Sequence, residues 1–274
     1  MLVAMLEMER SSLAVGAMLA EGGEGRVHEL ADHRETLFKA YRSPVAAGPL
    51  RALVEWPAAL AAVQPDLATR VKAASAWPSA LVLEGSSGRA AGLLMPRAPR
   101  RFWVRHRDGG LRLSSLSYLT ADPRQRAAAY GLELPAPMAA ERLGLAYALA
   151  RLIEAFEGCV PCVAHGDLSA RNVLWSLERG PEVFVIDCDN AEIFGPDGLP
   201  AAADGRRRAM TPNWDDPAVA RGTNPTLASD RYSLALIFLR IVGAANFPIQ
   251  ARQRGGGPVS VDFPVPAGGP ASRL

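Results

Sequence analysis

The sequence predicts an α+β fold, with strands in the first third of the chain and helices further along. Short apolar segments around a glycine-rich turn, at residues 13–19 and 36–41, are typical of strands. Residues 138–156 carry apolar side chains at helical spacing, with Pro137 before them as a start signal and Gly158 after them as a stop. The chain has 274 residues, of which 49% are hydrophobic, so it can bury a large core as one bilobed unit or as two small domains.

The first two strands enclose a turn that contains Gly22, Gly23 and Gly25. Glycine has no Cβ, so the backbone of such a hairpin can approach a ligand closely. Lys39 lies on the next strand, where its ammonium group can either bind an anion or face the solvent. A glycine-rich turn and one lysine are a weak signal by themselves, and a plain hairpin is the alternative interpretation.

An Ala- and Leu-rich segment at residues 49–67 predicts the helix that packs against this sheet. Trp56 and Pro57 interrupt the pattern, because the residue before a proline disfavours helical backbone angles, so a regular helix is not expected there. Residues 81–84 and 91–97 predict two more strands.

The overall charge and composition exclude several kinds of protein. A net charge of +2 predicts no polyanionic partner such as nucleic acid, and three cysteines argue against a disulfide-stapled secreted fold. The first ten residues contain two glutamates and no basic leader, so they do not resemble a signal peptide. The longest apolar run, at residues 234–242, contains Arg240 and is too short to span a bilayer. We therefore expect a cytoplasmic protein without nucleic-acid or membrane partners.

Two local patterns suggest other functions, but both have structural interpretations. Six arginines between residues 97 and 112 could form a nucleic-acid surface. Neither the net charge nor regular aromatic spacing supports one, so we expect a solvated face. Cys159 and Cys162 resemble a redox or zinc pair. The sequence has no second pair or histidine cluster to complete a tetrahedral site, so we expect structural cysteines.

The strongest functional pattern joins two acidic motifs across an apolar strand. His165-Gly166-Asp167 begins a loop in which Asn172 follows Asp167 by five residues, and an apolar segment further on ends at Asp187. Magnesium-assisted phosphoryl transfer needs such groups. One carboxylate orients the acceptor hydroxyl, while a carboxamide and a second carboxylate hold metal ions that bridge the nucleotide phosphates. A hydrogen-bonded turn is the alternative, but the spacing and the strand after Asn172 favour a phosphotransfer site.

The constellation from His165 to Asp187 resembles the catalytic core of the protein-kinase-like superfamily. The resemblance extends over about residues 13–248. It implies a bilobed protein-kinase-like fold, α+β, with a β-rich N-lobe at residues 1–96 and a mainly helical C-lobe at residues 97–274, which together form one catalytic domain.

The same resemblance assigns roles to individual residues. Asp167, Lys39 and Asn172 would be catalytic, with Asp167 orienting the acceptor and Lys39 binding the phosphates of ATP. Asn172 and Asp187 would hold Mg2+. The remaining nucleotide contacts would be Gly22, Gly23, Gly25 and Val27 in the phosphate loop and Met95 at the hinge beside the adenine. Glu55 would be the ion-pair partner of Lys39, although a plain surface glutamate is the alternative.

The chain departs from the protein-kinase pattern at several positions. Ala20 replaces the first glycine of the phosphate loop. Gly166 replaces an arginine that usually neutralises a phosphate on the activation segment, so control by phosphorylation there is not expected. Asp189 replaces a glycine, which gives a D-C-D segment and either stiffens the turn or adds a carboxylate near the metals. Ser169 and Arg171 replace lysine and glutamate, which leaves the acceptor specificity open.

The chain also contains segments that bear on the acceptor. The H-G-D form of the loop is typical of small-molecule kinases such as aminoglycoside and choline phosphotransferases. Residues 211–217 instead resemble the close of a protein-kinase activation segment, and residues 228–236 and 243–248 resemble the large-lobe central helix and the turn after it. In protein kinases, the aspartate at the position of Asp230 binds the catalytic-loop backbone, and a helix cap at Ser229 or Asp230 is the alternative. We therefore expect a serine/threonine protein kinase with a protein substrate. A small-molecule kinase and a nucleotide-binding pseudokinase are the alternatives.

Beyond residue 248 the sequence is rich in proline and glycine and shows no helical periodicity. The terminal helices of a full protein-kinase lobe are therefore not expected. Either the lineage lacks them, or the sequence is a piece of a longer protein.

Overall fold

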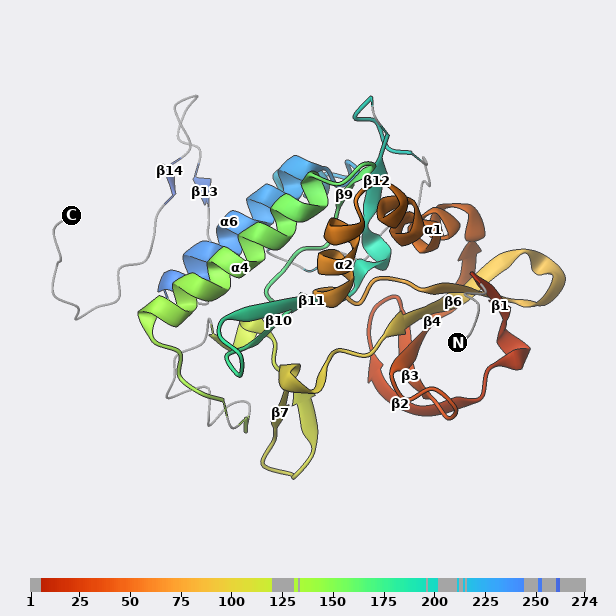
Figure 1. Ribbon diagram of the computed structural model, residues 1–274, viewed down its shortest axis with the longest axis horizontal. Helices are drawn as coiled ribbons and strands as arrows, with labels where there is room; N and C mark the ends of the chain where they lie inside the picture. The colour runs from red at the N-terminus through yellow and green to blue at the C-terminus, as the bar shows by residue number, and fades with distance from the viewer. Residues whose placement is uncertain are drawn as a thin grey trace, which may run out of the picture.

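The computed structural model describes residues 6–119, 131–132, 134–195, 197–201, 211, 214, 216–243, 251–252 and 260–261. Within these residues the fold is α+β and bilobed, with a β-sheet and a helix pair near the amino terminus and a mainly helical second part (Figure 1). The fold class predicted from the sequence is therefore confirmed. The lobe boundary between residues 96 and 97 stays a prediction.

A six-stranded sheet forms the first part, in the order β1-β5-β6-β4-β3-β2. The strands are β1 (Glu7–Glu9), β2 (Val15–Glu21), β3 (Gly25–Leu30), β4 (Thr36–Ala46), β5 (Ala80–Leu83) and β6 (Arg89–Pro96). β1 runs parallel to β5, and all other neighbours are antiparallel. The strands expected from the sequence correspond to β2, β4, β5 and β6. β4 is longer than expected, because it continues to Ala46.

Two consecutive helices, α1 (Ala47–Val63) and α2 (Pro65–Ala73), replace the single helix predicted at residues 49–67. α1 continues through Pro57, so the expected irregularity is wrong. Proline has no N–H to offer to the carbonyl of Leu53 one turn earlier. The indole Nε1 of Trp77 donates to that carbonyl instead, at 2.7 Å. A tertiary contact thus satisfies the group that Pro57 leaves without its helical partner.

The second part contains two long helices, α4 (Ala139–Glu157) and α6 (Leu227–Gly243), which lie side by side (Figure 1). α4 confirms the helix predicted at residues 138–156. The shorter elements that position the site are β9 (Cys162–Ala164), β10 (Val173–Ser176), β11 (Glu182–Val185), η5 (Cys188–Asn190), β12 (Glu192–Phe194) and α5 (Pro217–Ala220). Others are η1 (Arg10–Ser12), η2 (Gly85–Ser87), η3 (Arg100–Phe102), β7 (Trp103–Arg105), β8 (Leu111–Leu113), η4 (Leu116–Leu119), β13 (Ala251–Arg252) and β14 (Ser260–Val261). β10 pairs with β11, and β9 pairs with β12.

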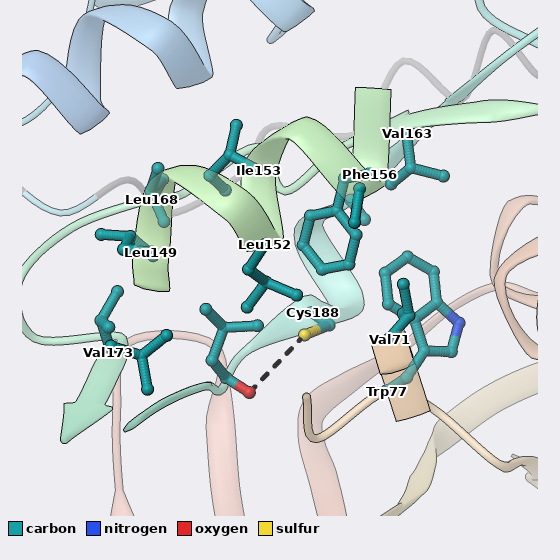
Figure 2. Close-up of a cluster of buried hydrophobic side chains, with 14 of the residues drawn as sticks. Val71, Trp77, Leu149, Leu152, Ile153, Phe156, Val163, Leu168, Val173 and Cys188 are labelled. Carbon is teal, nitrogen blue, oxygen red and sulfur yellow. Dashed lines mark hydrogen bonds between the residues drawn. The ribbon is translucent and has the colours of Figure 1, made fainter. Parts of the chain in front are cut away.

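One apolar core joins the two parts. Trp77 packs against Trp56 of α1, with ring centroids 4.3 Å apart, and against Phe156 of α4 at 6.0 Å. The indole Nε1 of Trp56 donates to the carbonyl oxygen of Pro161 at 2.9 Å. Figure 2 shows Trp77 and Phe156 within this cluster, together with Cys188. The core therefore reaches from α1 to the segment that carries the predicted metal ligand.

The features that suggested other functions have structural partners. Arg97 and Arg101 form ion pairs with Glu29 and Glu182. The thiol of Cys159 is buried and donates to the carbonyl oxygen of Ala155. In the part of the chain that the structure describes, no helix has the length and apolar character needed to cross a membrane.

Candidate active site

The loop between β9 and β10 carries the predicted catalytic residues. His165 is fully buried, and its Nε2 lies 2.9 Å from the carbonyl oxygen of Ile186. A carbonyl oxygen only accepts hydrogen bonds, so Nε2 donates, and Nδ1 accepts the backbone N–H of Asp167 at 3.4 Å. The imidazole ring therefore joins the catalytic loop to the strand end just before Asp187.

Asp167 and Asn172 are in direct contact. Asn172 Nδ2 donates to the backbone oxygen and to Oδ2 of Asp167, each at 2.8 Å. The backbone of Asn172 is fixed as well, because its carbonyl oxygen accepts the N–H of Ile186 at 2.9 Å. These bonds place both side chains where the strand β11 runs into Asp187.

Thr211 also binds the Asp167 carboxylate. Its backbone N–H donates to Oδ1 at 2.8 Å, and its hydroxyl donates to Oδ2 at 3.1 Å. Burial raises the pKa of Asp167 to about 6, although the hydrogen bonds from Thr211 and Asn172 act in the opposite direction. The negative charge of Asp187 adds to the increase. The predicted catalytic carboxylate is thus already bound to a threonine hydroxyl.

The backbone conformation and the close surroundings of residue 166 require a glycine. Its φ of +84° lies in the left-handed region, and a Cβ here would lie 2.2 Å from the carbonyl oxygen of Asn190. No side chain fits at that distance. The sequence suggested only that an arginine had been lost at this position. In the structure, the catalytic loop and the segment after Asp187 approach each other too closely for any residue but glycine.

Asp230, in the first turn of α6, supports the catalytic loop. Its carboxylate accepts the backbone N–H groups of His165 and Gly166, the latter at 3.2 Å. Thr226 and Ser229 cap the helix by exchanging bonds between side-chain oxygens and backbone N–H groups. The interpretation of Asp230 as an anchor of the catalytic loop is confirmed. The alternative that Ser229 or Asp230 serves only as the N-cap is wrong, since Thr226 precedes the helix.

The three side chains of the D-C-D segment, Asp187 to Asp189, have different environments. Asp187 has a left-handed φ of +57°, which is uncommon for a residue with a side chain and typical of functional positions. Cys188 turns into the core, where burial raises the pKa of its thiol and Sγ donates to the carbonyl oxygen of Val185 (Figure 2). Asp189 is buried, with 4% of its surface exposed.

Lys39 on β4 meets this segment. Its Nζ lies 2.7 Å from Asp189 Oδ1, 3.4 Å from Glu24 Oε2 and 3.5 Å from Asp187 Oδ1. Burial alone would lower the pKa of this amine, but the negative charges of Asp189, Asp187 and Glu24 raise it above its ordinary value. Burial alone would raise the pKa of Asp189, whereas the charge of Lys39 and the bonds from Lys39 and Tyr41 lower it. The pair is therefore ionised.

The partner predicted for Lys39 is wrong. Glu55 lies on an exposed face of α1, and within the described residues the ion pairs of Lys39 go to Glu24, Asp187 and Asp189. The neighbouring helix therefore does not supply the acid that pairs with Lys39. Asp189 instead reaches Lys39 from 150 residues further along the chain.

The glycine-rich turn joins β2 to β3 near Lys39. The N–H of Gly22 donates to the carbonyl oxygen of Gly25 at 2.9 Å, which closes the turn around Gly23. A Cβ on Gly25 would lie 2.1 Å from a carbonyl oxygen of β4, so the contact between strands already requires glycine there. Val27 is the cross-strand partner of Lys39.

Met95, the predicted hinge residue, lies near the end of β6. It pairs with Leu37 of β4, and its side chain is buried. The chain leaves the sheet at this end of β6 and passes to the second part of the fold. The nucleotide contacts assigned to Met95 and to the glycine-rich turn stay predictions.

Sequence reasoning did not assign three residues of this site. Thr211 donates to the Asp167 carboxylate, Asp189 binds Lys39, and Tyr41 donates to Asp189 Oδ2 at 3.1 Å. Asp189 had a local signal, since it is a second acid in the D-C-D segment. Tyr41 also had one, because a residue two positions from Lys39 lies on the same face of a strand. Of residues 211–217, which the sequence compares with an activation segment, residues 212, 213 and 215 lie outside the described residues. Residues 244–248 also lie outside them.

A comparison with protein families identifies the family of this chain. The model of the Phosphotransferase enzyme family (APH) matches residues 19–194, more than half of the 274-residue chain. No curated protein matches the chain significantly. The matched range includes Lys39, Asp167, Asn172, Asp187 and Asp189. This chain therefore belongs to the phosphotransferase enzyme family, within the protein-kinase-like superfamily.

Proposed function

We propose that this protein transfers the γ-phosphoryl group of ATP to a hydroxyl group with the help of Mg2+, and that the acceptor is a serine or threonine side chain of a protein. The observation that carries this proposal is the contact between Asp167 and a hydroxyl group. Thr211 Oγ1 donates to Asp167 Oδ2 at 3.1 Å. An alcohol in that position is oriented by the carboxylate and can give its proton to it.

The oxygen donors near Asp187 suit a magnesium ion. The carboxylate of Asp187 is partly exposed, and the side-chain nitrogen Nδ2 of Asn172 binds Asp167, which leaves the side-chain oxygen Oδ1 of Asn172 for a cation. Across the described residues, no group of three or more His, Cys, Asp or Glu side chains forms a metal cage. Magnesium in kinases is held by one or two carboxylates and by the nucleotide phosphates, so no such cage is needed. When bound, the ion would neutralise charge on the phosphates.

Lys39 supplies the positive charge for these phosphates. Its side chain is buried and its pKa is raised, so it stays protonated at neutral pH. A lysine ammonium acts as a point charge toward phosphate. The turn from Gly22 to Gly25 lies on the neighbouring strands, and its backbone can approach the phosphates without a Cβ in the way.

Asp167 would act on the acceptor. The acceptor oxygen bonds to the γ-phosphorus, and the bond from this phosphorus to the β,γ-bridging oxygen breaks. The hydroxyl proton moves to Asp167, whose pKa of about 6 keeps it mainly ionised, and thus able to accept, at neutral pH. Catalysis of this kind rests on positioning and electrostatics, which the bonds from Asn172 to Asp167 provide.

Two observations support a protein as the acceptor. A threonine side chain of the chain itself already binds the catalytic carboxylate. Asp230 holds the catalytic loop in the way that the resemblance to protein kinases predicts. Both Thr211 and Asp230 lie beyond residue 194, where the family match ends.

A small-molecule alcohol is the second candidate acceptor. The family match favours it, because the matched range contains the H-G-D loop at residues 165–167. The two candidates share the same nucleotide site and the same base. They differ only in the molecule whose hydroxyl group binds beside Asp167. Peptides and small alcohols, offered separately as acceptors, therefore distinguish them.

The test offers both kinds of acceptor to the purified protein. Labelled ATP and Mg2+ would be incubated with peptides that contain serine and threonine, and separately with small alcohols that include aminosugars and choline. Asp167→Asn removes the base, and Asp197→Asn, at an exposed aspartate after β12, is the matched control. Label on peptides that only Asp167→Asn abolishes supports the proposal. Label on small alcohols alone selects the second candidate, and no label on either rejects transfer.

Nucleotide binding is tested separately. Mg-ATP should raise the melting temperature of the wild type, because a ligand that binds the native state stabilises it. Asp187→Ala should abolish most of this shift, whereas Asp197→Ala should keep it. A melting curve of the wild type that millimolar Mg-ATP does not change would reject both the kinase and a nucleotide-binding pseudokinase.

A further inference from the structure

The three carboxylates near Lys39 Nζ differ in distance and burial. Asp189 is the closest, at 2.7 Å, and the side chain of Asp189 is only 5% exposed. Glu24 and Asp187 lie at 3.4 and 3.5 Å, and their side chains are 24% and 37% exposed. The short contact shielded from solvent is therefore the one to Asp189.

Both oxygens of Asp189 bind to the strand β4. Oδ1 accepts from Lys39, and Oδ2 accepts from the hydroxyl of Tyr41 at 3.1 Å. Lys39 and Tyr41 are two residues apart on one strand, so their side chains lie on the same face. A carboxylate that bridges two neighbours on one face fixes the direction of the lysine side chain better than a single ion pair does.

The backbone that carries Asp189 is itself held in place. Cys188, just before it, is buried in the core among residues of α4 and beside Trp77 (Figure 2). Asn190, just after it, is buried, and its carbonyl oxygen lies against Gly166. The position of Asp189 therefore depends on the apolar core and on the catalytic loop.

We infer that Asp189 is the positioning residue for Lys39. It keeps the ammonium group in place when Asp187 and Glu24, which are farther away and more exposed, give up their contacts to a metal ion and to phosphates. This inference rests on the proposed function, because it assigns Lys39 to the nucleotide. It also assigns to the D-C-D segment a role that the resemblance placed on the helix after β4.

A double-mutant cycle with Lys39 tests this role. Asp189→Asn should lower kcat/KM for Mg-ATP by about tenfold or more, mostly through a weaker affinity for Mg-ATP. When Asp189→Asn is added to Lys39→Met, the further loss in Mg-ATP affinity and in kcat/KM should be less than about twofold, since Asp189 acts through Lys39. Equal losses in both backgrounds would overturn the inference.

Two further variants serve as controls. Glu55→Gln changes the acid that the sequence suggested on α1, and its kinetics should match those of the wild type. Tyr41→Phe keeps the ion pair but removes the hydrogen bond to Oδ2 of Asp189. Its kcat/KM for Mg-ATP should therefore fall, but by less than that of Asp189→Asn. A loss for Glu55→Gln as large as that for Asp189→Asn would overturn the inference.

A measurement without nucleotide separates this inference from the proposed function. Asp189→Asn and Lys39→Met should each lower the melting temperature, and the double variant should lower it by less than the sum, because neither buried charge is left alone. If the two losses in melting temperature are additive, the pairing of Lys39 with Asp189 is overturned, whether or not the protein has phosphotransfer activity. If the wild type binds Mg-ATP without turnover, the proposed transfer fails, and the affinity cycle still decides the inference. If it does not bind Mg-ATP at all, both are overturned.

Discussion

The backbone N–H of Gly166 donates to Asp230 Oδ1 at 3.2 Å, so the helix α6 holds the loop that carries Asp167. The same carboxylate accepts the N–H of His165, and Asp230 is itself buried. One side chain therefore links the central helix of the second part to the loop that contains Asp167. Removing it tests how far the geometry of the loop depends on this helix.

Asp230→Ala should lower the free energy of unfolding by about 1–3 kcal/mol, because two buried N–H groups lose their acceptor. Turnover should fall more than Mg-ATP affinity, since Lys39 keeps its own contacts on β4. Denaturant melts and steady-state kinetics measure both effects. Arg231→Ala, at the next residue, breaks only an exposed ion pair with Glu157 and should cost less than about 1 kcal/mol. Full activity of Asp230→Ala would contradict the anchoring role.

The same residue should make stability depend on pH. Burial raises the pKa of Asp230 to about 6, although bonds from His165 and Gly166 oppose the increase, and in the unfolded chain the carboxyl titrates near 3.8. Between about pH 4 and pH 6 the native state therefore holds more protons than the unfolded state, so the free energy of unfolding decreases as the pH rises. Between about pH 4 and pH 7, the free energy of unfolding of the wild type should decrease by on the order of 3 kcal/mol relative to that of Asp230→Asn. Urea melts across this range measure the difference, and a difference in favour of the wild type that grows with pH would refute the assignment.

Glu24 should compete with the nucleotide for Lys39. Its carboxylate lies 3.4 Å from Nζ, and the glycine-rich turn brings it there. Glu24→Gln removes this competitor, so the Kd for Mg-ATP should decrease about two- to fivefold, which corresponds to roughly 0.4–1 kcal/mol. Titration calorimetry measures the change. Glu21→Gln is the matched control, because Glu21 lies on the same hairpin but pairs with Arg26 and Arg42. Weaker binding by Glu24→Gln would show that this acid helps to hold the nucleotide.

Two glycine substitutions should separate backbone strain from a steric clash. Gly166→Ala and Gly180→Ala both place a Cβ on a residue with positive φ, at +84° and +98°, which costs about 1–3 kcal/mol. Only Gly166 also has a backbone oxygen 2.2 Å from the new Cβ, whereas Gly180 has no atom within 4 Å. We expect Gly166→Ala to lower the free energy of unfolding, measured in denaturant melts, by roughly 1–3 kcal/mol more than Gly180→Ala does. It should also reduce turnover, because it displaces Asp167. Equal costs for the two variants would contradict the close approach.

The residues that sequence reasoning brought together are those whose geometry is local. Asp167 and Asn172 lie in one loop, so their spacing was enough to predict that they act together, and they are hydrogen-bonded. Asp187 could be placed because a short apolar strand ends at it. The partner of Lys39 could not be predicted in this way. The D-C-D segment shows that Asp189 is a second acid there, but it does not show that this acid binds a lysine 150 residues earlier in the chain.

The fold shows the same limit. α4 and four of the six strands of the sheet, β2, β4, β5 and β6, follow from local sequence patterns, whereas β1, β3 and the strand order do not. The passage of α1 through Pro57 does not, because the carbonyl that the proline leaves free is bound by Trp77 from beyond the end of α2. Local rules describe what a segment prefers in isolation, and a donor from elsewhere in the fold overrides that preference.

The stacked indoles of Trp56 and Trp77 give the protein an optical reporter of its own. Their centroids lie 4.3 Å apart with the ring planes at 37°, so their electronic transitions couple and contribute a circular dichroism signal that depends on this angle. Trp56 is bound to Pro161, just before β9, and Trp77 to Leu53 of α1. A change in the packing of Trp77 against α1 would therefore change the spectrum, and Trp77→Phe would remove that response. The packing of Trp77 against α1 can in this way be followed in unlabelled protein.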